Sequence, residues 1–482
     1  MANRDRWEPR SSEGRHLEKE EPLKGNISVI QGTQSVSTKQ RRIAELARQK
    51  PSEALTSLHH HIDIEWLVEA WERTRKDGAS GIDGQKAKDY AVNLRDNLAD
   101  LLERFRSGSY QAPPVRRVQI PKGDGKSTRP IGIPTIEDKV MQRAIVMLLE
   151  PIYEAEFKDF SFGFRPGKSA RNAVDYLWKQ SMGDWGKRPV KWILDVDIKA
   201  FFDTLDHVHL RQMLDQRVRD GVVRRMIDKW LKAGVMEKGQ LSYAEEGTPQ
   251  GGVISPLLSN IYLHEVLDQW FEREVQPRMK GRAFLIRYAD DFVIGFEQEE
   301  DARRVHKVLP QRFERYGLTL HPEKTRLVAF APPQPKEKNE KNAKKEKEPP
   351  EQSGPGSRGS FDFLGFTHRW RRSRRGTPVM QHGTSSKRFT RALTRLKQWL
   401  AENLHEPIRE QWKTLRKKMQ GHYNYYGVKG NSHALNAYSY EAQRVWFQSL
   451  NRRGGAQALT WERFRKWLQE IIPWPAPRMR SP

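Results

Sequence analysis

The chain contains no cysteine, and this absence narrows the chemistry that it can perform. Disulfide bonds, thiolate zinc sites and cysteine nucleophiles are all excluded. The sequence also lacks any apolar run close to the roughly 20 residues that a membrane-spanning helix requires, so we expect no membrane partner. Residues 1–20 are charged throughout and have no apolar signal-peptide core, which argues against secretion and favours a cytoplasmic location.

Acidic residues are too few to balance the basic ones. The 482 residues include 86 lysines and arginines against 61 aspartates and glutamates, a formal net charge of +25. An excess of this size points to a polyanionic partner, and nucleic acid is the leading class. The length suggests about two to four lobes with enough apolar material for a core.

One stretch interrupts the alternating helical and strand patterns of residues 94–330. Residues 331–360 contain no Leu, Ile, Val or Phe and consist mostly of Lys, Glu, Pro, Asn and Gly. This composition cannot bury enough apolar surface to offset its ordering entropy, so it predicts a disordered linker or loop. Residues 1–60 are interpreted as a loosely ordered N-terminal extension with one short amphipathic pattern around residues 43–46.

The pattern after the linker is helical. Apolar residues recur at helical spacing between residues 385 and 475 and predict a basic bundle of three or four helices. On the first of these helices Arg388, Arg391 and Arg395 form a stripe nearly opposite the apolar face. A solvated helix face is the ordinary explanation of such a stripe, but the net charge favours contact with nucleic acid.

The strongest chemical signal is a hairpin pattern over residues 284–296. Two β-rich apolar segments flank a short acidic turn that presents Asp290 and Asp291. Carboxylates beside hydrophobic strands are costly unless a positive charge neutralises them, and hard divalent cations do so well. An isolated Asp-Asp turn is usually only a solvated turn, so the interpretation depends on a second acidic segment.

That second segment is a strand pattern over residues 192–198. The alternation places Asp195 and Asp197 on one face and apolar residues on the other. Asp197 together with the acidic turn could hold two Mg²⁺ ions about 4 Å apart, which suits in-line phosphoryl transfer. Asp195 is interpreted as a structural or supporting carboxylate.

Four motifs give the chain a family resemblance. Tyr288-Ala289-Asp290-Asp291 resembles the YxDD motif of reverse transcriptases, and residues 197–203 are similar to the first metal-binding motif of group II intron reverse transcriptases. Residues 162–170 and 247–260 resemble two further blocks of that family, in the family's order. The resemblance, to a group II intron reverse transcriptase/maturase, covers roughly residues 62–475.

The resemblance implies an α+β fold, a right-hand polymerase with fingers, an antiparallel-sheet palm and a helical thumb. The expected division is an N-terminal extension (1–60), mainly fingers (61–190), mainly palm with the YADD hairpin (191–330), a linker (331–360), a primer-grip segment of the palm (361–384) and a thumb or maturase domain (385–475).

The resemblance also implies roles for single residues. Asp197, Asp290 and Asp291 become the catalytic carboxylates and the metal ligands. Phe202 would pack under the sugar of the incoming nucleotide and exclude a 2′-hydroxyl, while its neighbour Phe201 belongs to the core. Gln250 would contact the sugar and base of that nucleotide.

The resemblance also implies roles for several lysines and arginines. Residues 120–130 predict a hairpin on which Lys122 and Arg129 face each other, and the resemblance makes both bind the triphosphate. Lys324 matches a palm position near the triphosphate, with a plain surface lysine as an equally weighted alternative.

Contacts with the nucleic acid strands complete the expected site. Arg165 and Lys168 are expected to touch the template strand, because backbone charge dominates affinity for nucleic acid. The turn around Gly365 resembles the primer grip.

The implied function is that of an RNA-directed DNA polymerase encoded by a group II intron. It would copy an RNA template from a DNA primer with Mg²⁺ and deoxynucleotides, and bind group II intron RNA as a maturase. Two alternatives remain open: a maturase-only RNA-binding splicing factor, and a domesticated relative that serves DNA repair or defence. Without paired cysteines we expect no zinc-dependent endonuclease, and we expect a prokaryotic protein associated with nucleic acid.

Overall fold

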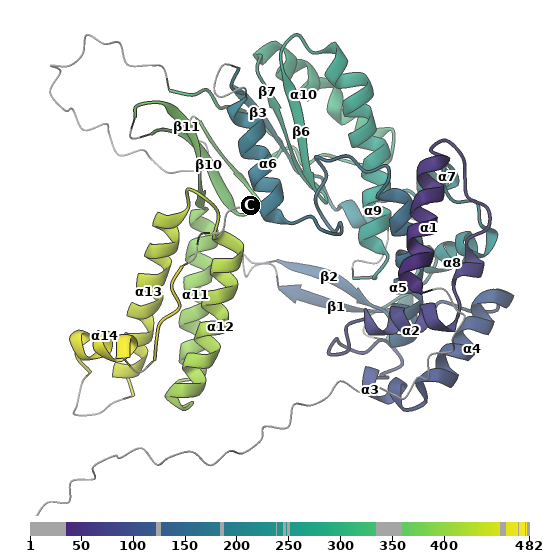
Figure 1. Cartoon of the computed structure of the whole chain (residues 1–482), viewed down its shortest axis with the longest axis horizontal. Helices are drawn as coiled ribbons and strands as arrows, with labels where there is room; N and C mark the ends of the chain where they lie inside the picture. Colours follow the sequence, from purple (N-terminus) through teal and green to yellow (C-terminus); the bar gives the residue numbers. More distant parts are fainter. Residues whose placement is uncertain are drawn as a thin grey trace, which may run out of the picture.

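The computed structural model describes residues 35–121, 127–183, 188–237, 239–243, 247, 251–333, 359–373, 375–453, 459–470, 472–477 and 479. Lys122, Gln250 and most of the predicted linker lie outside these described residues, so the predictions made for them stay predictions. Figure 1 shows a larger body of helices and sheets that is joined through strands β10 and β11 to a separate bundle of helices. Among the described residues, no helix combines the length and apolar character needed to cross a bilayer.

The first part of the chain is mainly helical. Its α-helices are α1 (Val36–Gln49), α2 (Ile64–Glu72), α3 (Ala87–Tyr90), α4 (Leu94–Ser107) and α5 (Ile136–Tyr153), with 3₁₀ turns at His59–His61 and Ala91–Asn93. Polar side chains cap α2 and α5: Asp63 accepts from the backbone N–H of Trp66, and Thr135 from that of Asp138. The apolar residues of α5 are buried almost all round, so this helix forms the centre of the N-terminal core.

Helix α1 corrects the prediction that residues 1–60 form a loosely ordered extension. Ser35 caps its first turn by accepting a hydrogen bond from the backbone N–H of Thr38, and the helix packs against α5. Ile43 and Ala47 are each only 1% exposed. The sequence signal was weak because only this narrow stripe of an otherwise polar helix faces the core.

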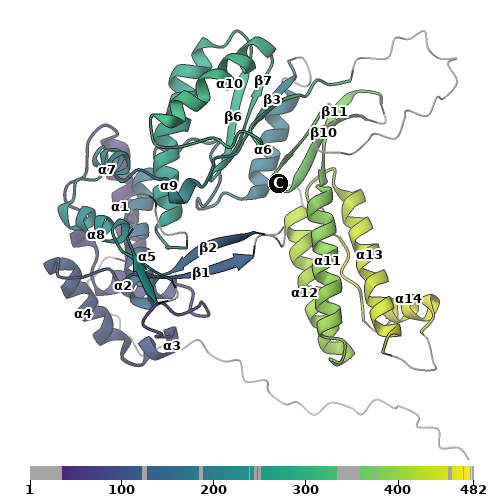
Figure 2. The ribbon, with the colours of Figure 1, turned by 180° about the vertical axis from the view of Figure 1, so that it is seen from behind.

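A small sheet carries the predicted hairpin of residues 120–130. Strands β1 (Val115–Pro121) and β2 (Thr128–Ile133) pair antiparallel, and Ile120 lies opposite Arg129. Two short strands, β4 (Val235–Glu237) and β5 (Gln240–Ser242), extend the sheet in the order β2-β1-β4-β5. Figures 1 and 2 show β1 and β2 projecting from the N-terminal helices toward the helical bundle.

The central sheet has the strand order β6-β7-β3-β8 and is antiparallel throughout. Its strands are β3 (Trp192–Val196), β6 (Ala283–Tyr288), β7 (Asp291–Phe296) and β8 (Arg326–Ala329). The pairing of Tyr288 with Asp291 confirms the predicted hairpin of residues 284–296. Helix α6 (Ala170–Met182) packs against β6, whereas α10 (Glu299–Glu314) packs against β3 and β7.

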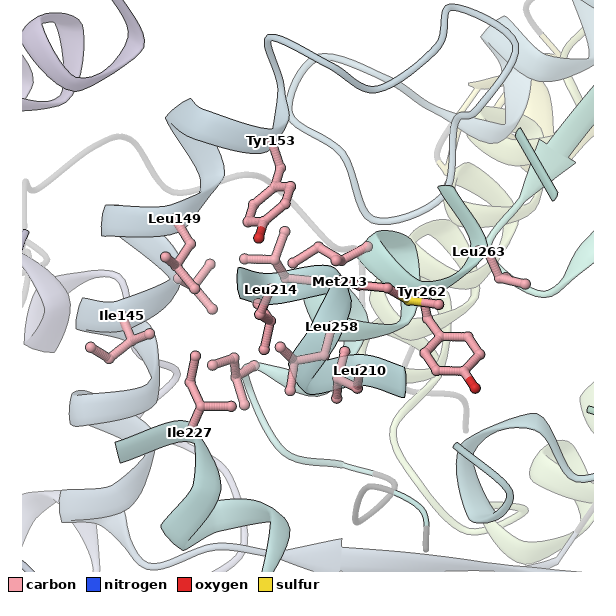
Figure 3. Packing of buried hydrophobic residues seen from close by; sticks show 14 of the residues in the cluster. Ile145, Leu149, Tyr153, Leu210, Met213, Leu214, Ile227, Leu258, Tyr262 and Leu263 are labelled. Carbon is pink, nitrogen blue, oxygen red and sulfur yellow. The ribbon is translucent and has the colours of Figure 1, made fainter. Parts of the chain in front are cut away.

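The core beside this sheet joins segments that are distant in sequence. Figure 3 shows Ile145, Leu149 and Tyr153 of α5 facing side chains of α7 (His207–Asp215), α8 (Gly221–Leu231) and α9 (Ser255–Leu263). Two π-helical segments, His264–Asp268 and Phe271–Val275, and a 3₁₀ turn at Gln276–Arg278 continue from α9 toward the central sheet. Full burial of each such side chain contributes about 1.5–3 kcal/mol, so this core fixes the elements that hold the acidic residues.

The C-terminal part comprises a three-stranded antiparallel sheet and the bundle. Strands β9 (Ser360–Phe363), β10 (Phe366–Arg372) and β11 (Pro378–Thr384) precede helices α11 (Ser386–Glu402), α12 (Ile408–Tyr426), α13 (Ser432–Asn451) and α14 (Trp461–Glu470). The bundle has its own core around Leu415, Met419 and Trp446. The predicted helical bundle is confirmed, as is the mixed α and β character with antiparallel sheets.

Candidate active site

The central sheet brings the predicted acidic residues to one edge. Val196, the last residue of β3, pairs with Phe292 of β7, so Asp197 lies beside Asp291. Asp290 precedes Asp291 in the turn between β6 and β7. Ala289, in the same turn, has a left-handed backbone with φ of 58°, which lets the strands reverse within two residues.

Negative charge accumulates at this edge. The Asp291 side chain is exposed at the sheet edge, but the surrounding protein still removes much of its hydration. This desolvation, together with the negative charges of Asp195, Asp290 and Asp197, raises the pKa of Asp291 to about 7. Burial also raises the pKa of Asp290 above its usual range, and that of Asp195 to about 6. A positive ion placed here would relieve this repulsion and favour the ionised carboxylates.

Two cations already lie against these carboxylates. Nζ of Lys324 is 2.8 Å from Oδ2 of Asp197, and Nε of Arg326 is 3.1 Å from Oδ2 of Asp195. The ion pair with Arg326 fits the interpretation of Asp195 as a supporting carboxylate. Within the described stretches, no three acidic or histidine side chains converge closely enough to enclose a metal ion.

A buried network under the acidic turn was missed by sequence reasoning. Arg287 is fully buried and forms two hydrogen bonds with the carboxylate of Asp268, at 2.8 and 2.6 Å. Its Nη1 also donates to Oδ1 of Asn260 at 2.9 Å and to the carbonyl of Ala289 at 3.1 Å. The one available sequence signal is an arginine within an otherwise apolar strand, a position that requires partners.

The segment around Gly163 lies directly against the same turn. A Cβ atom at Gly163 would lie 2.2 Å from the backbone nitrogen of Ala289, so only glycine fits this approach. The carbonyl of Gly163 accepts a hydrogen bond from Nδ2 of Asn260 at 2.8 Å. Gly163 therefore brings the block of residues 162–170 into close contact with the acidic turn.

Arg165 does not occupy the position expected of a template contact. Its side chain is 4% exposed, pairs with Glu154 at 2.8 Å and donates to the carbonyls of Lys158 and Ser161. These partners leave the guanidinium facing inward, so the predicted contact of Arg165 with a template strand does not fit the structure. Lys168 lies nearer the surface, 3.4 Å from Asp159, and its predicted contact stays a prediction.

The two phenylalanines after Asp197 differ in burial, as the sequence suggested. Phe201 is buried in the main core, and Phe202 is half-buried, with its ring edge-on to that of Phe201 at 5.4 Å. Both lie in the 3₁₀ turn Phe201–Asp203, which begins five residues after β3. Phe202 thus keeps a free ring surface close in sequence to Asp197.

Two glycines fix the ends of the segment that contains Gln250. A Cβ atom at Gly247 would lie 2.8 Å from the carbonyl oxygen of Asp203, and one at Gly251 would lie 2.5 Å from that of Gly132. Both glycines have positive φ angles, of 88° and 110°. The segment therefore starts beside the turn of Phe202 and ends against β2.

Of the cations predicted to bind the triphosphate, Arg129 lies on β2 and Lys324 lies in the turn before β8. Arg129 is exposed on β2, and its charge opposes the rise that burial causes in the pKa of Asp290 and in that of Asp203. The strand register places Ile120 opposite Arg129, so the prediction that Lys122 faces Arg129 was wrong, and Lys122 itself lies outside the described residues. Lys324 directly contacts Asp197, one of the predicted catalytic carboxylates, which favours the palm-site interpretation over that of a plain surface lysine.

The helical bundle reaches the site through the turn between β9 and β10. A Cβ atom at Gly365 would lie 3.4 Å from Cγ of Arg388, and the hydroxyl of Tyr425 donates to the carbonyl of Leu364 at 3.0 Å. Burial and the neighbouring carboxylates raise the pKa of Asp291, and the charge of Arg388 opposes that rise. Arg391 and Arg395 follow on α11, half-buried and exposed respectively.

Comparisons with known proteins identify the family of the chain. Residues 120–368 match the family described as reverse transcriptase (RNA-dependent DNA polymerase). Protein YkfC of Escherichia coli strain K12 is 36% identical over 288 residues, which cover 54% of this chain and 75% of that protein.

Two further relatives are named for introns. Group II intron-encoded protein LtrA of Lactococcus lactis subsp. cremoris is 35% identical over 249 residues, which cover 49% of this chain and 40% of LtrA. Nuclear intron maturase 2, mitochondrial, of Arabidopsis thaliana is 30% identical over 235 residues, 40% of this chain and 31% of that protein. The resemblance to group II intron reverse transcriptases and maturases is thus confirmed, and the chain belongs to the reverse transcriptase (RNA-dependent DNA polymerase) family.

Proposed function

We propose that this chain is an RNA-directed DNA polymerase of the group II intron type, which copies RNA into DNA and also binds intron RNA as a maturase. The observation that carries the proposal is the placement of Asp197 beside Asp291, with Asp290 in the adjoining turn. Three carboxylates at one sheet edge suit transfer of a nucleotidyl group, whereas RNA binding alone does not require them.

Two Mg²⁺ ions fit this set of donors. Carboxylate oxygens are their preferred ligands, and Mg²⁺ is commonly bound through one or two carboxylates together with substrate phosphates. Asp197, Asp290 and Asp291 would hold the ions, which when bound activate the primer hydroxyl and stabilise the leaving pyrophosphate.

The residues around the acids would position the nucleotide. Arg129 on β2 and Lys324 beside Asp197 supply positive charge for the triphosphate, together with Lys122. Phe202 offers a bulky ring that would collide with a 2′-hydroxyl and so select deoxynucleotides. Gln250 would contact the sugar and base from the segment between Gly247 and Gly251.

We assign the division into fingers, palm and thumb on the same basis. The β1–β2 hairpin and N-terminal helices would form fingers, the central sheet the palm, and α11–α14 the thumb. An RNA template paired with a DNA primer would then contact Lys168, the Gly365 turn and the stripe of Arg388, Arg391 and Arg395. Such a protein would act in the cytoplasm, associated with nucleic acid.

A maturase without polymerase activity is the second candidate. The names of the intron-related proteins and the basic stripe on α11 favour RNA binding, and RNA binding can coexist with polymerisation. Service in DNA repair or defence is a third possibility, and intron sequence flanking the gene would distinguish it from an intron-encoded protein.

Primer extension on an RNA template with Mg²⁺ tests the proposal. The native protein is compared with Asp290→Ala, and RNA binding is measured for both. We expect the native protein to incorporate deoxynucleotides and the variant to bind RNA without extending the primer. If neither protein extends the primer while both bind RNA tightly, the maturase-only function replaces the polymerase.

A further inference from the structure

A cavity of about 540 Å³ lies away from the acidic residues, where the bundle joins the rest of the chain. Its walls come from α6, from β10 and β11, and from the segment between α12 and α13. A volume of this size falls within the range of small-molecule and nucleotide pockets, about 300–1,000 Å³. None of its lining residues belongs to the proposed catalytic site.

The walls of the cavity are fixed by hydrogen bonds between these elements. Nε1 of Trp178 on α6 donates to the carbonyl of Met380 on β11 at 2.9 Å. Nε2 of Gln381 donates to the carbonyl of Gly430 at 3.1 Å. The cavity is therefore preformed, and a ligand would not have to meet the cost of ordering it.

Four cations surround the cavity. Arg371 and Lys429 are exposed at its rim, and Arg171 and Arg372 also line it. The carboxylate that lines the cavity, Asp175, is already paired with Lys179 at 2.8 Å. The surroundings are consequently strongly positive and suit an anion such as a phosphate group.

Arg171 gives a more specific indication. Its Nη2 donates to the carbonyl of Asn424 at 2.7 Å, which fixes the guanidinium. Its Nε is buried and has no hydrogen-bond partner among the described residues. A buried N–H without a partner is uncommon in folded proteins, and it leaves Arg171 with an unused donor beside the cavity.

The floor of the cavity is apolar and aromatic. Val174, Val379 and Met380 line it together with the partly exposed ring of Trp178. Burial lowers the pKa of His382 to about 4, so this lining histidine is neutral at pH 7. A flat apolar surface surrounded by cations matches a nucleotide, whose base can stack while its phosphate binds the arginines.

We propose that this cavity binds one unpaired nucleotide of a single-stranded nucleic acid, with its phosphate at Arg171 and Arg371 and its base against Trp178. A concave pocket admits a base that is not stacked within a duplex, whereas paired bases are covered on both faces. The site would hold a single strand outside the catalytic centre. It does not depend on the polymerase activity proposed above.

Photocrosslinking of the full chain tests the site directly. Single-stranded RNA containing 4-thiouridine is irradiated with the protein, and the crosslinked peptides are identified by mass spectrometry. We expect peptides that contain Trp178 or Met380 to be crosslinked, and a blunt RNA duplex to leave these peptides unmodified. Crosslinks confined to other peptides, or equal crosslinking by the duplex, would overturn the proposal.

Two variants distinguish the effect of filling the cavity from the effect of removing a positive charge. Val379→Trp fills the cavity without changing charge, and we expect it to reduce the pocket crosslinks about tenfold while crosslinks to the bundle persist. Arg371→Glu should weaken single-stranded RNA binding about tenfold, as expected for one charge-assisted contact. Equal losses with Arg375→Glu, an exposed charge on the same hairpin that does not line the cavity, would contradict the site.

Further experiments show whether the site binds RNA or DNA and whether its binding is independent of catalysis. Single-stranded DNA with 4-thiothymidine is compared with the RNA, and pocket crosslinks from either strand support the site, whereas their absence from both refutes it. Asp290→Ala should retain the pocket crosslinks while it loses primer extension. A thermal melt that matches the native one shows that Val379→Trp is folded.

Discussion

The ammonium group of Lys324 lies 2.8 Å from Oδ2 of Asp197, so a lysine neutralises a carboxylate that we propose binds Mg²⁺. Asp197 directly follows β3 and Lys324 precedes the adjacent strand β8, 127 residues apart in sequence. Because the lysine side chain is 60% exposed, it can turn from the carboxylate to a nucleotide phosphate. Lysine and metal ion would thus compete for Asp197 until the nucleotide is bound.

Lys324→Ala should therefore change two concentration dependences in opposite directions. We expect the KM for deoxynucleotide to rise about tenfold, the loss of one charge-assisted contact, and the Mg²⁺ concentration for half-maximal rate to fall. Steady-state primer extension at varied nucleotide and Mg²⁺ measures both. Lys307→Ala, at an exposed position on α10, is the control. An unchanged KM would show that Lys324 is only a surface lysine.

Phe202→Val should weaken discrimination between deoxynucleotides and ribonucleotides. The half-buried ring of Phe202 is the proposed obstacle to a 2′-hydroxyl, and its removal should lower the ratio of kcat/KM values at least about tenfold. Single-nucleotide incorporation with each substrate gives the ratio. Phe201→Leu alters the buried neighbour and should reduce stability while leaving the ratio unchanged. The same ratio in native protein and Phe202→Val would refute the assignment.

The ion pair between Arg287 and Asp268 should be costly to break. Both side chains are fully buried, so Asp268→Asn leaves the arginine without its counter-charge and should lower the free energy of unfolding by about 3–5 kcal/mol. Asn260→Ala removes one hydrogen bond of the network and should cost about 1–3 kcal/mol.

Urea unfolding compares these variants with Glu300→Gln. Glu300 pairs with Lys280 on the surface, where both side chains are more than half exposed, and its loss should cost less than about 1 kcal/mol. Costs of similar size for Asp268→Asn and Glu300→Gln would contradict the structural importance of the buried pair.

The buried carboxyl group of Asp138 should make the stability of the fold depend on pH. Burial raises its pKa to about 6, even though the Tyr110 hydroxyl and the Trp230 indole donate to its Oδ1 at 2.7 and 2.8 Å. The folded protein therefore binds this proton more tightly than the unfolded chain does, and that contribution is lost as the pH rises from about 4 through 6. The pKa of Asp138 is about two units higher in the folded protein than in the unfolded chain, which corresponds to a loss of about 3 kcal/mol in the free energy of unfolding over this pH range.

Asp138→Asn should remove this contribution. The amide keeps the acceptor oxygen and carries no charge at any pH, so the variant should gain stability relative to the native protein between pH 4 and pH 7. Urea unfolding of both proteins across this range isolates Asp138 from the other titrating groups. A constant difference across the range would contradict the assignment.

Strand and helix periodicity explains what the sequence could predict. The alternation over residues 192–198 placed Asp195 and Asp197 on one face because side chains of a strand alternate with a period of two. The YADD hairpin followed from apolar segments that flank a short turn. The bundle followed from apolar residues at helical spacing. All three signals are local in the chain.

The parts that sequence could not predict depend on tertiary contacts. Arg165 lies in a motif that suggests an exposed cation, but its burial depends on Glu154 and on carbonyl groups of a loop. The network of Arg287 joins residues from the π-helical segment, from α9 and from the acidic turn. Such partners have no common spacing in the sequence.

The most direct measurement compares two carboxylates on the same stretch of chain. Asp197→Asn and Asp195→Asn remove one charge each, two residues apart, and single-turnover incorporation of one deoxynucleotide on an RNA template gives their rates. We predict a loss of about 10³-fold or more for Asp197→Asn, a metal ligand in the proposed site, and less than about tenfold for Asp195→Asn, which pairs with Arg326. Equal rates for the two variants would contradict the proposed two-metal site.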